Sequence, residues 1–189
     1  MKVNFIENTP SAVRFRISGV GNTFVNSLRR VMTNSVPTFA IDSITFYENT
    51  SSMFDEYIAH RIGLVPIATP EGYDEKDEIV FHLDAEGPKT VYSKELEGTD
   101  KKVKIANENI PLIKLAEGQR LKVDGKAILS TGMKSSKFQP GLISFTANDD
   151  NTEFEFYIET FGQMTAKEIL NRALDIIDKG LKATHKELK

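Results

Sequence analysis

The sequence predicts an α+β fold, in which both ends of the chain build one domain around an inserted, mostly β domain. Strand and helix periodicities follow one another in the first third of the chain and return in its last fifth. Between them lie short strand-like runs, which glycine and proline interrupt. We therefore expect a discontinuous domain of residues 1–66 and 149–189, with two helices packed on a sheet, and an inserted domain of residues 67–148.

The first strand and helix are predicted by alternation and by breaker residues. Residues 13–17 alternate apolar and basic side chains, as a half-buried strand does. Gly19-Val20-Gly21 should end this strand, and Asn22 or Thr23 should cap the helix that follows. The helix should end before Val36-Pro37, because the residue before proline is disfavoured in the helical region.

A second strand and helix follow, and then the chain changes character. Residues 39–47 suit a strand, and Ser52 with Asp55 suggests a capping box for a helix that Gly63 would stop. Residues 71–78 are acidic, which suggests a flexible segment at the start of the insert. Four short strands are expected beyond it, at residues 79–83, 103–105, 121–123 and 127–129.

The last strand and helix carry the clearest patterns. Residues 153–159 alternate acidic and apolar side chains, and Thr165 with Glu168 forms a second capping box. We expect this strand to share one sheet with the two strands near the amino terminus.

Both terminal helices carry an apolar stripe. Adjacent to the first stripe are Arg29 and Arg30, and a wide stripe edged by arginine suits a helix that packs on its own sheet and also on another chain. Periodicity alone agrees equally well with the alternative that the stripes belong only to the core of this chain. The stripes consist of Phe24, Val25, Leu28, Val31 and Met32 in the first helix, and of Ile169, Leu170, Ala173, Leu174, Ile177 and Leu181 in the second.

Composition excludes several classes of function. The 24 Lys and Arg against 27 Asp and Glu give a net charge of -3, so the chain lacks the basic excess of a protein that grips DNA alone. Cysteine is absent, which excludes disulfides, thiol nucleophiles and Cys-ligated metal. No long apolar run or leader peptide is present, which favours the cytoplasm and no membrane.

No constellation predicts catalysis. Phe24 stands where a dinucleotide-binding loop needs its third glycine, and no Walker lysine follows. His60, His82 and His185 lie in separate contexts without metal-ligand spacing. We expect no catalytic residues, no cofactor and no metal in this chain.

Three runs of residues resemble a known family. Gly19–Met32 resembles the G-x-G-N-T-x-x-N-x-L-R-R signature that opens the first dimerisation helix of the bacterial RNA polymerase alpha subunit and its archaeal and eukaryotic counterparts. Asp55–Ile67 is similar to a segment of the archaeal D subunit and the eukaryotic third-largest subunit. Phe156–Gly162 looks like the family's last strand before its second dimerisation helix.

The resemblance implies a non-catalytic assembly subunit of a multi-subunit DNA-directed RNA polymerase. The two stripes would bind the small subunit L, with Leu28 and Leu174 as anchors at their centres. The heterodimer, with small subunits N and P, would then receive the large B subunit, to which Arg30 would bind. DNA would be reached only through the assembled polymerase.

The chain departs from the family in two places. Many D subunits carry a cysteine-rich iron–sulfur domain after the segment that matches Gly132–Pro140, and this chain has no cysteine. Ser135–Phe138 also replaces the usual His-Ala-Lys-Trp. Two other classes of function remain as alternatives to an assembly subunit. A stand-alone enzyme would have polar side chains that converge on one site, and a DNA-binding module would have a basic face.

Overall fold

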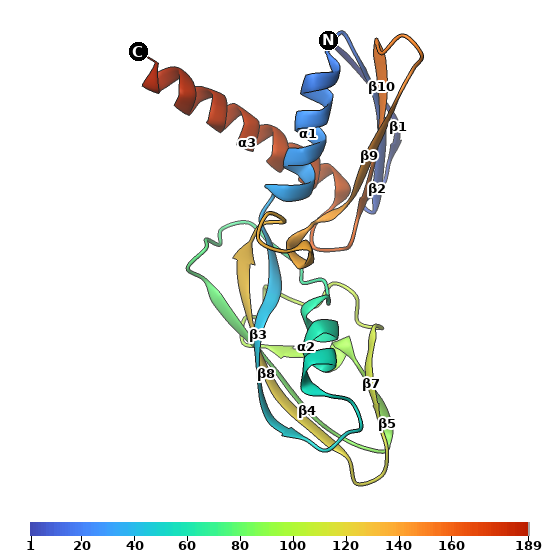
Figure 1. The fold of residues 1–189 in the computed structure, drawn as a ribbon, viewed down its shortest axis with the longest axis vertical. Helices are drawn as coiled ribbons and strands as arrows, with labels where there is room; N and C mark the ends of the chain where they lie inside the picture. The colour runs from blue at the N-terminus through green and yellow to red at the C-terminus, as the bar shows by residue number, and fades with distance from the viewer. Residues whose placement is uncertain (189) are drawn as a thin grey trace. The chain divides into compact units, whose positions relative to one another are not determined.

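The chain folds into two compact units, each with its own hydrophobic core. The computed structural model describes residues 1–188, which form an α+β fold with three α-helices and ten strands. The first unit combines residues 1–37 with the residues from 131 onward, and the second consists of Thr38–Ser130. Figure 1 shows the elements of both units.

The first unit contains a four-stranded antiparallel sheet that joins the two ends of the chain. Strands predicted at residues 13–17 and 153–159 are confirmed, and they are direct neighbours in this sheet. Phe15 and Phe156 stack across this pair with ring centroids 5.0 Å apart. The strand order is β1 (Lys2–Asn8), β2 (Ala12–Ser18), β10 (Glu153–Thr160) and β9 (Gly141–Ala147).

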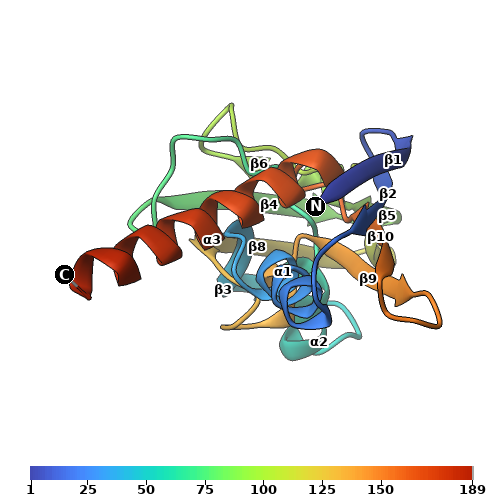
Figure 2. The same ribbon diagram turned by 90° about the horizontal axis from the view of Figure 1, so that it is seen from above.

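Two helices lie on one face of this sheet, as Figure 2 shows. They are α1 (Asn22–Asn34) and α3 (Ala166–Glu187), and they pack on each other as well as on the sheet. A short 3-10 turn at Ser136–Phe138 precedes β9. The core of the unit lies between helices and sheet, and from the strands it takes Val13, Phe15, Ile17, Ile143, Phe154, Phe156 and Ile158.

The predicted cap of α3 is confirmed, and that of α1 is wrong. In α3 the Glu168 backbone N–H donates to Thr165 Oγ1 at 3.3 Å, and the Thr165 N–H donates to Glu168 Oε2 at 2.7 Å. The Thr165 hydroxyl is the largest cause that lowers the pKa of Glu168 below its usual value. In α1 the N-cap is Gly21, and no side chain caps the helix, because Asn22 already lies inside its first turn.

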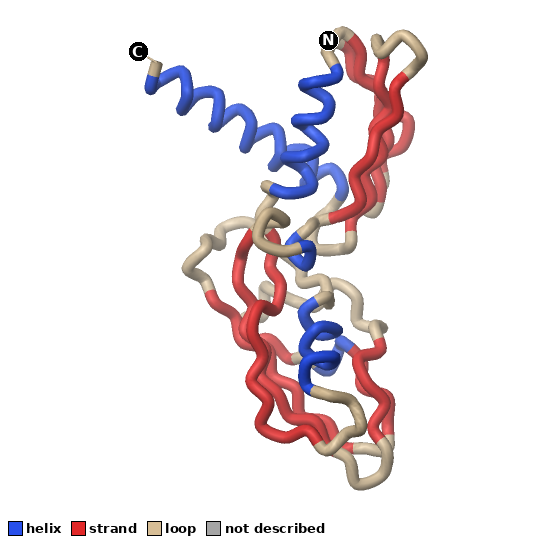
Figure 3. The backbone as a smooth tube through the Cα atoms, in the orientation of Figure 1, coloured by secondary structure: helices blue, strands red, loops and turns tan. Residues whose placement is uncertain are grey.

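The second unit consists of two antiparallel sheets and one helix. Figure 3 shows the helix α2 (Asp55–Gly63) beside the strands. Its Ile58 and Ile62 are fully buried in the core of the unit. The larger sheet has the order β3 (Thr38–Asn49), β8 (Arg120–Ser130), β4 (Glu78–Glu86) and β6 (Glu97–Gly98). The smaller one pairs β5 (Lys89–Tyr92) with β7 (Pro111–Leu115), and a 3-10 turn at Ser93–Glu95 follows β5.

The prediction that all terminal strands share one sheet is wrong. Strand β3 pairs along its length with β8 and makes no ladder with β2 or β10. Local periodicity could not show this, because the paired residues lie about 80 positions apart in the chain. The two units accordingly divide the chain at different places from the predicted domains of residues 1–66 with 149–189 and 67–148.

Four local predictions in the second unit also fail. The N-cap of α2 is Phe54 rather than Ser52, and Gly63 is still helical. Residues 103–105 contribute only an isolated bridge, Ile67 to Ile105. The strands expected at 121–123 and 127–129 are one strand, β8. Its Gly125 serves close packing rather than a turn, because a Cβ there would lie 3.0 Å from Ile41 Cγ2.

Candidate subunit interface

Much of the two apolar stripes is used inside the first unit. Leu28, which was expected to anchor a partner, is only 2% exposed and lies in the core between helix and sheet. Such side chains serve the core of the unit, and a partner contact at this part of the stripes stays a prediction. The buried members are Val25, Leu28, Met32, Ile169, Leu170 and Ala173.

The remaining stripe residues stay accessible. Phe24 is 36%, Leu174 41% and Leu181 66% exposed, while Val31 and Ile177 are half-buried at the edge of the core. We call these five side chains the helix surface. Since isolated apolar side chains on a surface are common, it is their grouping on two helices of one unit that suggests an interface.

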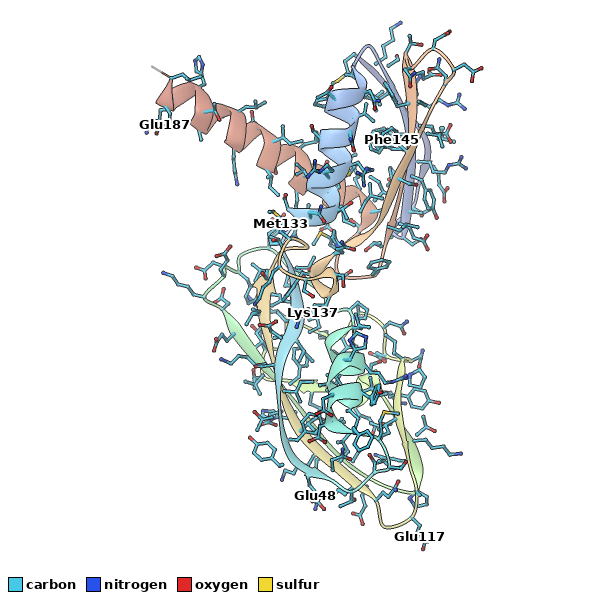
Figure 4. The ribbon with its side chains drawn as sticks, in the orientation of Figure 1. Glu48, Glu117, Met133, Lys137, Phe145 and Glu187 are labelled. Carbon is cyan, nitrogen blue, oxygen red and sulfur yellow. The ribbon has the colours of Figure 1, made fainter. Side chains whose placement is uncertain are left out.

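The burial of α3 changes along its length. Its fully buried residues lie between Ala166 and Ala173, and Ile176 and Ile177 pack at the edge of the core. The part after Ile177 is exposed and extends away from the sheet towards Glu187 (Figures 1 and 4). From Leu170 onward, apolar residues recur along α3 at intervals of three or four. Leu170, Leu174, Ile177 and Leu181 are spaced by four, three and four residues, which matches the 3.5-residue repeat of a seam between helices.

Two charged residues of outer α3 pair with each other along the helix. Lys182 Nζ lies 2.5 Å from Asp178 Oδ2, one helical turn away. An exposed pair of this kind contributes little to stability, because water and salt screen it. Such charges make the outer part of α3 amphipathic, with an exposed apolar stripe beside them.

The two arginines of α1 have different surroundings. Arg29 is half-buried, and its Nη2 donates to Asn26 Oδ1 at 3.0 Å. Arg30 is exposed, and no ion pair forms between it and any carboxylate among residues 1–188. It borders a hollow of about 330 Å³ near the end of α1, where Figure 4 labels Met133. The hollow is lined by Ser27, Arg30, Val31, Asn34, Ser35 and Met133.

Strand β1 was missed by the sequence reasoning, although it adds apolar surface to the first unit. Val3 is 42% and Phe5 52% exposed. The Phe5 ring lies 5.8 Å from that of Phe15, which belongs to the core under the helices. The alternation of Val3 and Phe5 with Lys2 and Asn4 was the available signal.

Among residues 1–188, one cluster of polar side chains joins a histidine, a carboxylate and a tyrosine on the surface of the second unit. His82 Nδ1 lies 2.6 Å from Asp124 Oδ1, and Tyr47 donates to the other oxygen of this carboxylate at 2.9 Å. These contacts lie on an exposed sheet face and lower the pKa of Asp124, His82 being the larger cause. Within the described residues, no cluster of three or more His, Cys, Asp or Glu could hold a metal ion. None of the helices there combines the length and apolar character needed to cross a membrane.

Comparisons with known proteins point in one direction. The family described as the RNA polymerase Rpb3/Rpb11 dimerisation domain matches residues 14–181. DNA-directed RNA polymerase subunit Rpo3 of Methanocaldococcus jannaschii is 45% identical over 155 residues, which cover 82% of this chain and 79% of that protein.

Two further relatives are longer than this chain. The Rpo3 subunits of Thermococcus kodakarensis and Pyrococcus furiosus are each 42% identical to it over 152 residues. These matches cover 77% of this chain, but only 59% and 58% of the two relatives. The chain therefore spans about three fifths of these two proteins.

Proposed function

The chain belongs to the RNA polymerase Rpb3/Rpb11 dimerisation-domain family, and from this premise we propose that it is a non-catalytic assembly subunit of an archaeal DNA-directed RNA polymerase. Nucleotide transfer would then be carried out by other subunits, in the cytoplasm, and this chain would contact DNA only through them. In this proposal the first unit is the dimerisation domain and Thr38–Ser130 is the domain inserted into it.

The observation that carries this proposal is the helix surface. Phe24, Leu174 and Leu181 are large apolar side chains that water contacts in this chain alone. Covering them with the helices of a second protein would remove apolar area from water. This burial contributes about 25 cal/mol per Å² to the free energy of association. The apolar residues of α3 recur at intervals of three or four, and this spacing suits a partner helix that runs alongside it.

We further propose a partner for each part of the first unit. The small subunit L would cover the helix surface, and the heterodimer with small subunits N and P would receive the large B subunit. The hollow beside Arg30 would take part in binding the B subunit, because a guanidinium without a carboxylate partner suits an acidic group on another chain.

Co-expression tests the proposed dimerisation. The chain expressed alone should aggregate or self-associate, because its helix surface is open to water. Co-expression with subunit L should give a soluble one-to-one heterodimer, measured by size-exclusion chromatography with light scattering. A stable monomer that does not bind L would contradict the proposal.

Replacing Arg30 by alanine should separate the two steps of assembly. We expect Arg30→Ala to form the heterodimer with L normally, because the side chain is exposed and supports no described ion pair. Binding of the B subunit should weaken by roughly tenfold or more, as for loss of a charged contact at an interface. The measurement is reconstitution from purified subunits followed by size-exclusion chromatography.

Arg29→Ala is the matched control for this variant. Arg29 already donates to Asn26 within α1, so its loss should leave binding of the B subunit nearly unchanged. Normal binding of the B subunit by Arg30→Ala would remove Arg30 from the docking surface. Loss of the heterodimer itself would show that Arg30 acts in folding.

A further inference from the structure

We draw no further inference here: the strongest candidate, the outer edge of strand β9 in the first unit, has no charged residue and no bulge along its length, but nothing in the structure shows what covers it.

Discussion

Leu174→Asp should abolish the heterodimer while leaving the chain folded. Leu174 is 41% exposed at the point where α3 leaves the core of its unit, so the fold tolerates a charge there. In the heterodimer the same charge would be buried against an apolar partner helix without a counter-ion. We expect a loss of about 3 kcal/mol or more, which is over a hundredfold in Kd. The measurement is the Kd of the purified subunits, by calorimetry or by retention on an affinity tag.

Leu142→Asp is the control for this variant. Leu142 is a leucine of the same unit that is 54% exposed, and it lies on strand β9 rather than on a helix. The same change of side chain should leave binding to L nearly unchanged. If both variants bind L as the unchanged chain does, the helix surface is not the dimerisation interface. If Leu174→Asp loses its helical circular dichroism, the fold and not the interface depends on Leu174.

Leu28→Ala should have the opposite effect, a large loss of stability. Leu28 is 2% exposed and is enclosed in the core of its unit, so truncation would leave a cavity. Substitutions of this kind cost about 2–5 kcal/mol in free energy of unfolding. Urea denaturation of the purified chain, or of its heterodimer if the chain alone aggregates, measures this free energy.

Leu142→Ala is the matched control, because it removes the same atoms from an exposed position. Its free energy of unfolding should change by no more than about 0.5 kcal/mol. A Leu28→Ala variant with normal stability and weakened binding to L would contradict the burial seen here. It would return Leu28 to the interface that the sequence alone suggested for it.

The local signals of the sequence were sufficient for several elements and for the family. Alternation predicted strands β2 and β10, and the Thr165–Glu168 capping box predicted the start of α3. These features depend on residues within a few positions of one another, so a single sequence contains them. The Gly19–Met32 run is equally local, and the match of the family to residues 14–181 supports the resemblance it suggested.

Strand pairing was decided only by the tertiary structure. Periodicity shows that residues 39–47 alternate or run apolar, but it does not name the strand beside them. The partner is β8, about 80 residues later, and this pairing assigns β3 and α2 to the second unit. Strand β1 was missed for a different reason: its alternation was visible in the sequence, but most of its side chains stay exposed at the edge of a sheet.

The division of each apolar stripe between core and surface was also decided in three dimensions. A stripe marks one face of a helix, but it does not tell how much of the helix the sheet covers. Helix α3 has 22 residues and is about 33 Å long, and only its first turns pack on the core beside the sheet. Ile169 and Ala173 therefore fall inside the core, while Leu174 and Leu181 on the same stripe stay exposed.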